Sequence, residues 1–173
     1  VFLDIGANVE VRAQHLVQFA WLGAAFSKSV LGVERPEVGL LSVGEEAGKG
    51  NAFVKQTFAA MQAMDWASSC GARFVGNVEG RDLMGELTDV AVTDGFTGNV
   101  ALKAMEGTTK TVIKALLEAF DATPEARTAA ESLLPALLPL YAKFSPETYG
   151  GAMLLGVDGV CIISHGSSNA NAI

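Results

Sequence analysis

The sequence predicts an α/β protein with a mostly parallel sheet and helices on both faces. Short apolar runs typical of strands alternate with longer segments whose apolar residues recur at helical spacing, which favours parallel strands joined by helical crossovers. Five of the apolar runs are followed by glycine mixed with Asp, Asn, Glu or His. Because ligands of α/β proteins bind at the carboxyl ends of the strands, these loops predict one shared site. Glycine has no side chain and so lets backbone N–H groups come close to a ligand, and the start of a helix favours an anion. We therefore expect a small anionic ligand.

The first half of the chain shows this alternation. Val1–Ile5 is a short apolar run and predicts a buried strand. In Val11–Leu31 apolar residues recur three or four positions apart, which predicts a helix. Pro36 interrupts the chain before the next apolar run, so Val38–Val43 predicts a second strand. Gly50–Met64 again has helical spacing and predicts the next helix.

The second half continues the pattern with shorter strands. We expect a strand at Arg73–Val75, a short helix at Asp82–Leu87, a strand at Asp89–Thr93, a long helix at Asn99–Phe120 and a fifth strand at Val160–Ile163. Apolar residues of the long helix recur at helical spacing and are expected to face inward. They are Leu102, Met105, Val112, Leu116 and Leu117.

Segment Ala122–Ser145 differs from the rest because it is rich in Ala and Leu and contains Pro124, Pro135 and Pro139. Proline removes a backbone donor and clashes with the preceding turn, so we do not expect one uninterrupted helix. We predict instead a helical hairpin at residues 122–145, inserted in and projecting from one α/β domain that spans residues 1–173.

Composition narrows the classes of function. The 173 residues suffice for one domain with a core, and half of them are hydrophobic. A formal charge of −7 and a pI of about 4.8 argue against general nucleic-acid binding. Cys70 and Cys161 have no metal-binding spacing and lie among apolar residues, so we expect buried, reduced thiols and a cytoplasmic protein. Because Val1 is not Met and already reads as strand, we expect the chain to be part of a longer protein.

The loop Gly44–Asn51 follows a predicted strand and opens a predicted helix, as a phosphate-binding P-loop does. It lacks one spacer residue, and Gly50 replaces the Ser or Thr that would hold Mg²⁺, so we do not predict a P-loop. Two interpretations remain. Glu45 and Glu46 sit in a first helical turn and favour its dipole, or Lys49 acts as a point charge for a phosphate oxygen.

The loop Asp94–Asn99 has a similar position after a strand. In one interpretation Thr97 caps the following helix and the glycines only make the turn. In the other, the side chains of Asp94, Thr97 and Asn99 face one ligand, with Lys103 one helical turn later on the same side.

The last loop, His165–Asn169, combines a histidine with two serines. Ser168 is either a helix cap or part of a donor cluster for phosphate. No G-x-S-x-G elbow supports a nucleophilic serine in this loop.

Seven short motifs stand in order along the chain, and together they resemble the phosphate acyltransferase family of bacterial phospholipid synthesis. The resemblance covers essentially the whole chain and implies a three-layer fold similar to that of isocitrate and isopropylmalate dehydrogenases and of phosphotransacetylases. It also implies a protein of roughly twice this length whose N-terminal half is absent here. The motifs are Asp4–Asn8, Val38–Glu46, Lys49–Asn51, Phe74–Asp82, Asp94–Asn99, Tyr149–Gly151 and His165–Ser168.

The resemblance implies a reaction in which acyl-[acyl carrier protein] and inorganic phosphate give acyl phosphate and free acyl carrier protein. No cofactor, metal or protein nucleophile is required. The product would feed a membrane glycerol-3-phosphate acyltransferase. The resemblance further implies a homodimer that touches the inner face of the cell membrane peripherally through the hairpin; in the alternative interpretation, the apolar surface of the hairpin is buried in the dimer or against the sheet.

The same resemblance implies a set of site residues. Lys49 and Asn99 match positions that look catalytic: Lys49 would hold phosphate or the developing charge, and Asn99 would position the carbonyl or the phosphate. The implied substrate-binding residues are Asp4, Asn8, Gly44, Glu45, Asn51, Asn77, Glu79, Arg81, Asp94, Gly95, Gly98, Lys103, His165, Ser167 and Ser168.

Other functions stay open at this point. A phosphotransacetylase that uses acyl-CoA would carry out the same chemistry on a different acyl carrier. A non-catalytic, membrane-associated scaffold would have an incomplete site. An NAD-dependent decarboxylating dehydrogenase is suggested by analogy of fold alone, and the chain has neither G-x-G-x-x-G nor an acidic metal cluster.

Overall fold

The computed structural model describes residues 1–144 and 151–164 of the chain. The chain divides into two compact units, Val1–Ala104 and Met105–Ile173. The first unit contains four of the predicted strands and the four loops that follow them. We describe each unit by itself, beginning with the sheet.

The sheet of the first unit has four strands in the order β1-β4-β2-β3. Their bounds are Phe2–Leu3 for β1, Glu37–Leu41 for β2, Arg73–Val78 for β3 and Val90–Val92 for β4. Every pairing is parallel, which confirms the prediction of a parallel α/β sheet. The register of β2 and β3 shifts between Val38 and Gly39, where Gly76 of β3 has a φ of +103° that favours glycine.

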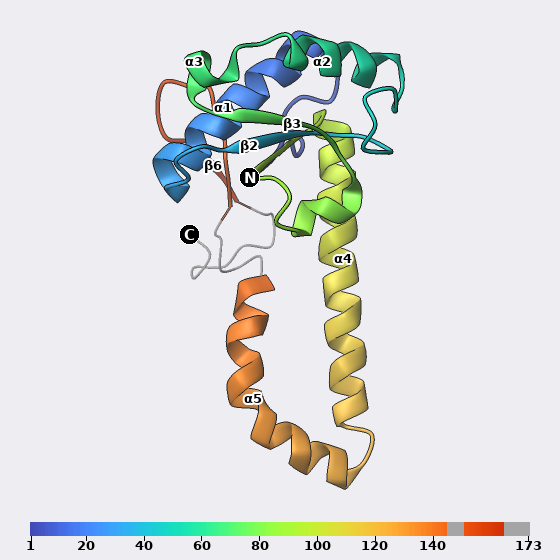
Figure 1. The fold of residues 1–173 in the computed structure, drawn as a ribbon. Helices are drawn as coiled ribbons and strands as arrows, with labels where there is room; N and C mark the ends of the chain where they lie inside the picture. The colour runs from blue at the N-terminus through green and yellow to red at the C-terminus, as the bar shows by residue number, and fades with distance from the viewer. Residues whose placement is uncertain (145–150, 165–173) are drawn as a thin grey trace. The chain divides into compact units, whose positions relative to one another are not determined.

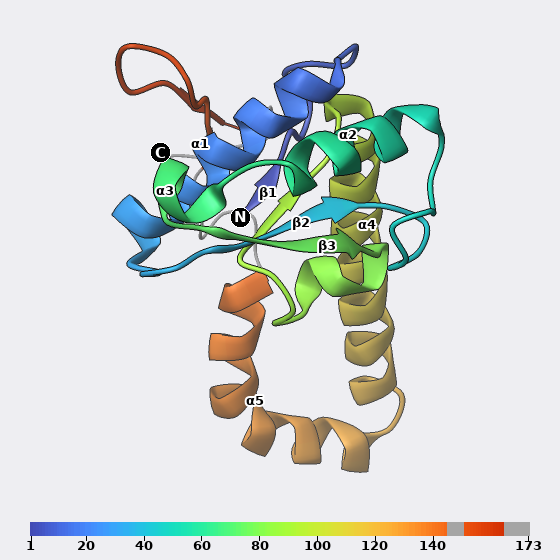
Figure 2. The same cartoon turned by 45° about the horizontal axis from the view of Figure 1, so that its top comes forward.

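Three helices pack on this sheet: α1 (Ala13–Leu31), α2 (Ala52–Gln62) and α3 (Trp66–Cys70). Figures 1 and 2 show them on the same side of β2 and β3. The core lies between these layers and contains Leu16 of α1, Val38 and Leu40 of β2, and Val90 of β4. Gly23 lets α1 approach closely, because a Cβ there would lie 2.5 Å from Val90 Cγ1. The α/β class is thus confirmed, whereas the three-layer dehydrogenase-like arrangement stays a prediction.

Two elements close the first unit. A short 3-10 helix, η1 (Gly80–Met84), follows β3 where a short helix at 82–87 was predicted. Helix α4 (Gly95–Phe120) follows β4 and starts four residues earlier than the predicted Asn99. It begins in the first unit and continues into the second.

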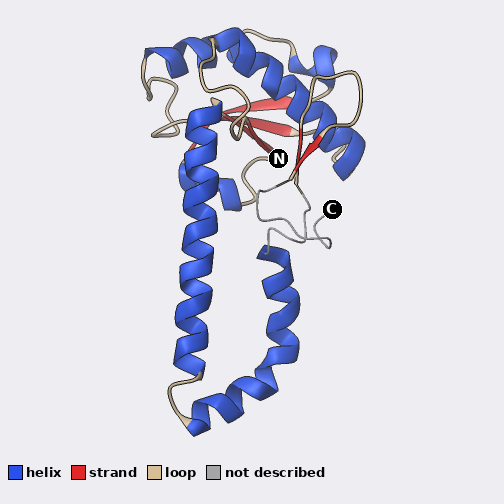
Figure 3. Cartoon of the chain, turned by 180° about the vertical axis from the view of Figure 1, so that it is seen from behind, coloured by secondary structure: helices blue, strands red, loops and turns tan. Residues whose placement is uncertain are grey.

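The second unit contains the rest of α4, α5 (Pro124–Phe144) and a two-stranded sheet. The prediction of an interrupted segment at 122–145 is wrong, because α5 is one helix that includes Pro135 and Pro139. Figure 3 shows that α5 is curved and runs back along the direction of α4 after a short turn, so the hairpin is made by α4 and α5 together. Proline in a helix removes one hydrogen bond and commonly bends the helix without ending it.

Three further expectations are corrected in this unit. The predicted fifth strand is β6 (Ile162–Ile163), which pairs antiparallel with β5 (Ala152–Met153) and not with the four-stranded sheet. Cys161 is exposed, whereas it was expected to be buried. Val112, Leu116 and Leu117 of α4 are exposed and do not face inward; helical spacing predicts an apolar stripe but not what covers it. Among the described residues, no helix has the length and apolar character needed to cross a membrane.

Candidate functional site

The carboxyl ends of the four parallel strands place four of the predicted loops at the same edge of the sheet. Asp4 follows β1, Asp94 follows β4, Gly44 follows β2, and Glu79 follows β3. In the strand order, β1 lies beside β4, β4 beside β2 and β2 beside β3. The hydrogen bonds of the loops fall into two groups, those at the ends of β1 and β4 and those at the ends of β2 and β3.

In the first pair, Asp4 organises its own loop. Its Oδ1 accepts hydrogen bonds from the N–H groups of Gly6 and Ala7, both at 2.8 Å. Its Oδ2 accepts from Asn8 N at 2.7 Å and Asn8 Nδ2 at 2.8 Å. Burial opposes ionisation of Asp4, but the hydrogen bonds from Asn8, Ala7 and Gly6 outweigh it and lower the pKa of this carboxyl. Asp4 was predicted to bind substrate, and the structure gives its carboxylate a role in holding the loop.

The Asp4–Asn8 loop lies directly on the first turn of α4. Gly95 N donates to Asn8 O at 2.8 Å, and Asn99 Nδ2 donates to Ile5 O at 3.0 Å. Gly98 is required by this contact, because a Cβ on it would lie 1.8 Å from Asp4 O. The amide nitrogen of Asn99 is therefore engaged by the loop, in contrast to the expectation that it points freely at a ligand.

Asp94, and not Thr97, caps α4. Its Oδ1 accepts a hydrogen bond from Thr97 N at 2.8 Å, and its Oδ2 accepts from Thr97 Oγ1 at 2.7 Å. An aspartate at this position satisfies one of the free N–H groups of the helix start. The carboxylate of Asp94 therefore stabilises the start of the helix, and Lys103 is exposed one helical turn after Asn99.

In the second pair, a single carbonyl group joins β3 to the loop that carries Lys49. Asn77 Nδ2 of β3 donates to Glu46 O at 2.9 Å, and Lys49 N donates to the same oxygen at 2.9 Å. A Cβ on Gly44 would lie 2.9 Å from Lys49 Cγ, so the aliphatic stem of Lys49 lies against this glycine. The side chain of Lys49 itself is exposed.

The ends of the Gly44–Asn51 loop also differ from the prediction. Asn51 caps α2 by accepting a hydrogen bond from Val54 N at 2.9 Å. Since α2 starts at Ala52, Glu45 and Glu46 lie in the loop, and the interpretation that placed them in a first helical turn is wrong.

Arg81 links the loops that follow β2 and β3. Its Nη2 lies 3.0 Å from Glu45 Oε1 and 2.9 Å from Glu79 Oε2. The hydrogen bond to Glu45 and the charge of Glu79 raise the pKa of Arg81. All three side chains are accessible to solvent, so the pairs add little stability; their effect is to keep a guanidinium group near Lys49's loop.

Four of the five predicted loops thus lie at one edge of the sheet, and several residues predicted to bind a ligand also hold these loops together; their role in ligand binding stays a prediction. Lys49 and Arg81 are exposed cationic side chains on loops at this edge. This combination suits an anion. His165, Ser167 and Ser168 lie outside the described residues.

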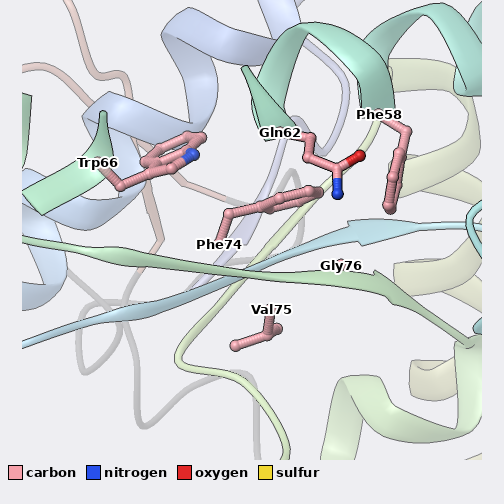
Figure 4. A pocket seen from close by; sticks show the side chains of 6 residues that line it. All are labelled: Phe58, Gln62, Trp66, Phe74, Val75 and Gly76. Carbon is pink, nitrogen blue, oxygen red and sulfur yellow. The ribbon is translucent and has the colours of Figure 1, made fainter. Parts of the chain in front are cut away.

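A cavity of about 270 Å³ that sequence reasoning missed lies between α2, α3 and β3. Figure 4 shows Phe58 and Gln62 of α2, Trp66 of α3 and Phe74 of β3 around it. The Phe58 and Phe74 rings meet edge to face at 5.4 Å, and Trp66 stacks on Phe74 at 6.0 Å. The recurrence of aromatic residues on these elements was the only signal in the sequence.

Comparison with known proteins gives consistent matches over the whole chain. The family described as "Fatty acid synthesis protein" matches residues 1–173. The chain is 47% identical over 173 residues to the phosphate acyltransferase of Elusimicrobium minutum, of which it covers 49%. It is 43% identical over the same length to the phosphate acyltransferase of Bacillus subtilis, of which it covers 50%. The chain spans about half the length of the curated relatives it matches.

Among solved structures, the chain is similar to EutD phosphotransacetylase from Staphylococcus aureus. The TM-score is 0.49 with 18% sequence identity, over 63% of this chain and 38% of that chain. The family match extends over every described strand-end loop. The chain therefore belongs to the family described as fatty acid synthesis protein.

Proposed function

We propose that the full-length protein containing residues 1–173 is a phosphate acyltransferase that converts acyl-[acyl carrier protein] and inorganic phosphate to acyl phosphate and free carrier protein. One observation carries the proposal. Relatives named phosphate acyltransferase are 43–47% identical to this chain over all 173 residues, so the similarity includes all the loops at the sheet edge. The anion-binding character of that edge supports the same activity.

The reaction is an acyl transfer. A phosphate oxygen attacks the thioester carbonyl carbon, a C–O bond forms, and the C–S bond breaks. The carrier protein leaves as a thiolate and takes up the proton that hydrogen phosphate loses. The protein's task is to hold phosphate against the thioester and to stabilise the oxyanion that develops on the carbonyl oxygen.

The described residues suggest a division of this task. We assign Lys49 to the phosphate or to the charge that develops during attack, because its ammonium group is exposed on a loop at the strand ends. We assign Arg81 to the same anion, since its guanidinium has five donors and lies at the neighbouring loop. Asn99, in the first turn of α4, donates one Nδ2–H to Ile5 O, and we assign its second N–H to positioning the carbonyl or phosphate.

The substrates also determine how the proposal is tested. Full-length protein is mixed with long-chain acyl-[acyl carrier protein], and free thiol is measured with and without inorganic phosphate in the absence of hydroxylamine. Acyl phosphate is trapped with hydroxylamine in parallel samples, and the hydroxamate formed without enzyme is subtracted because hydroxylamine also cleaves thioesters. We expect thiol and hydroxamate in equal amounts, only with phosphate, and faster with acyl carrier protein than with acyl-CoA. Preference for acyl-CoA would favour the phosphotransacetylase alternative, and phosphate-independent thiol release would contradict the proposal.

We also propose that the protein acts as a homodimer at the inner face of the cytoplasmic membrane and passes its product to a glycerol-3-phosphate acyltransferase. For the membrane contact, the support from this chain is the apolar surface of α5. Leu133 and Leu138 are 51% and 61% exposed, and exposed leucines on a helix suit shallow insertion at the headgroup boundary. A long-chain acyl phosphate could then leave directly into lipid.

A further inference from the structure

Asn77 of β3 is coupled to Lys49 through a single backbone carbonyl. The oxygen of Glu46 accepts both Asn77 Nδ2 at 2.9 Å and Lys49 N at 2.9 Å. The orientation of the Asn77 amide follows from this contact, because a carbonyl oxygen accepts hydrogen bonds only and must face the NH₂ group. One side-chain bond thus ties the turn Glu46–Lys49 to a strand of the sheet.

Asn77 is not accessible to a substrate. The residue is only 5% exposed, and its Oδ1 is buried with no hydrogen-bond partner among the described residues. A buried polar side chain left half-satisfied costs free energy, so its presence in the core calls for a specific role. The bond to the Lys49 loop is the interaction that its amide makes.

The loop needs such a restraint. Residues Gly44–Asn51 include Gly44, Gly48 and Gly50, and glycine gives the unrestrained backbone many conformations. Asn51 holds the end of the loop on α2, whereas Asn77 holds its middle. Without the Asn77 bond, the described hydrogen bonds left to this loop are the internal bond from Lys49 N to Glu46 O, the Asn51 cap and the solvent-exposed pair of Glu45 with Arg81.

We infer that Asn77 is a positioning residue that fixes Lys49 for catalysis, by binding the Glu46 carbonyl, and does not itself contact substrate. This inference rests on the proposed function in so far as Lys49 acts on phosphate. It revises the expectation that Asn77 lines the ligand cleft, and it gives a reason for a buried asparagine in a strand of apolar neighbours.

Limited proteolysis tests the structural half of the inference without any assay of activity. Trypsin cleaves the Lys49–Gly50 bond, and cleavage of a native protein reports how often the segment opens. In full-length Asn77→Ala we expect cleavage at Lys49 about fivefold faster, with cleavage elsewhere changed by less than about twofold. Ser27→Ala is the matched control: Ser27 Oγ is another buried, unpartnered group but lies on α1. Unchanged cleavage at Lys49, or equal acceleration at every site, would overturn the inference.

A double-mutant cycle tests the catalytic half. Asn77→Ala should lower kcat about tenfold with little change in KM for the acyl carrier protein, and it should have no further effect in a Lys49→Ala background. If the two effects multiply, Asn77 acts independently of Lys49 and the inference fails. Asn77→Ser, which keeps a polar group of smaller size, is carried through both experiments so that a poorly folding alanine variant does not decide the result.

The two experiments also separate this inference from the proposed function. Full activity of Lys49→Ala would remove Lys49 from the mechanism and with it the catalytic role of Asn77. Faster cleavage at Lys49 in Asn77→Ala would in that case still show the restraint on the loop. Absence of both effects would overturn the whole inference.

Discussion

Replacement of Gly98 by alanine tests the contact that brings two of the site loops together. Gly98 lies in the first turn of α4, and the Asp4 carbonyl rests against it so closely that a Cβ would lie 1.8 Å from Asp4 O. Ordinary contacts of a Cβ begin at 3.4 Å, so the loop would have to retreat by roughly 1.6 Å. The atom that must move is backbone, which no change of rotamer can relieve.

The cost follows from what this retreat breaks. The bonds from Gly95 N to Asn8 O at 2.8 Å and from Asn99 Nδ2 to Ile5 O at 3.0 Å would both be stretched beyond hydrogen-bond length. Two hydrogen bonds account for about 2 kcal/mol, and crowding adds about 1–3 kcal/mol. Alanine gains about 1 kcal/mol over glycine in a helix. We therefore expect a net loss of about 2–4 kcal/mol.

Urea unfolding of full-length protein, followed by circular dichroism, measures this loss as a lower midpoint at unchanged slope. Gly107→Ala is the matched control, because Gly107 lies on the same helix and, among the described residues, no atom outside its own stretch of helix stands within 4 Å of its added Cβ. That variant should gain about 0.5–1 kcal/mol. If Gly98→Ala is as stable as Gly107→Ala, the close approach of the Asp4–Asn8 loop to α4 is refuted.

Four other outcomes are expected. Lys49→Ala should lower turnover about a hundredfold or more, roughly 3 kcal/mol of charge stabilisation, and unchanged kinetics at limiting phosphate would remove Lys49 from the site. Asn99→Ala should impair turnover while costing about 1 kcal/mol in stability; a large drop in melting temperature with normal specific activity would show a structural role only. The folded-state pKa of Asp4 is lowered, so the ionised carboxylate contributes to the free energy of unfolding above the unfolded pKa of about 3.9, and this contribution is lost as pH falls through the folded pKa. The stability difference between wild type and Asp4→Asn should therefore shrink below about pH 4. A difference that stays constant with pH would contradict this. If the protein is the membrane-bound dimer proposed above, Leu137→Glu with Leu138→Glu should release that dimer intact from anionic vesicles with soluble activity retained, whereas dissociation of the dimer would show that these leucines are buried between subunits.

The alternation of strands and helices was predictable because its signals are local. Apolar runs, helical spacing and the break at Pro36 are enough to locate β1, β2, β4 and the long α1 to within a few residues. The strand that β6 pairs with was not predictable, since the pairing of a two-residue strand depends on which strand the fold places beside it. The continuity of α5 through Pro135 and Pro139 was missed because proline's cost can be met by bending.

The location of the site could be predicted from the sequence, whereas the contacts of its side chains could not. Parallel strands force their carboxyl ends to one edge, so glycine and polar residues after each strand suffice to predict that the loops meet. The task of each polar side chain depends on partners distant in sequence. Asn99 bonds a carbonyl 94 residues away, and Asn77 bonds one 31 residues away. Both partners are backbone oxygens, which every residue type has, so the identity of the partner residue gives no sign of the bond in the sequence.

The polar side chains of these loops fall into two groups that differ in their contacts. Asp4, Asp94, Asn51 and Asn77 each have a side-chain group engaged by backbone atoms of the loops or helix starts, while the ammonium of Lys49 is exposed. In the proposed reaction, charge moves from phosphate to the thioester oxygen and then to sulfur, so a cation held in place on a fixed backbone would stabilise the transition state. On this proposal, the short polar side chains fix the backbone and the long cationic side chains supply the charge. A substitution of the first kind should thus alter kcat through geometry, and one of the second kind through charge.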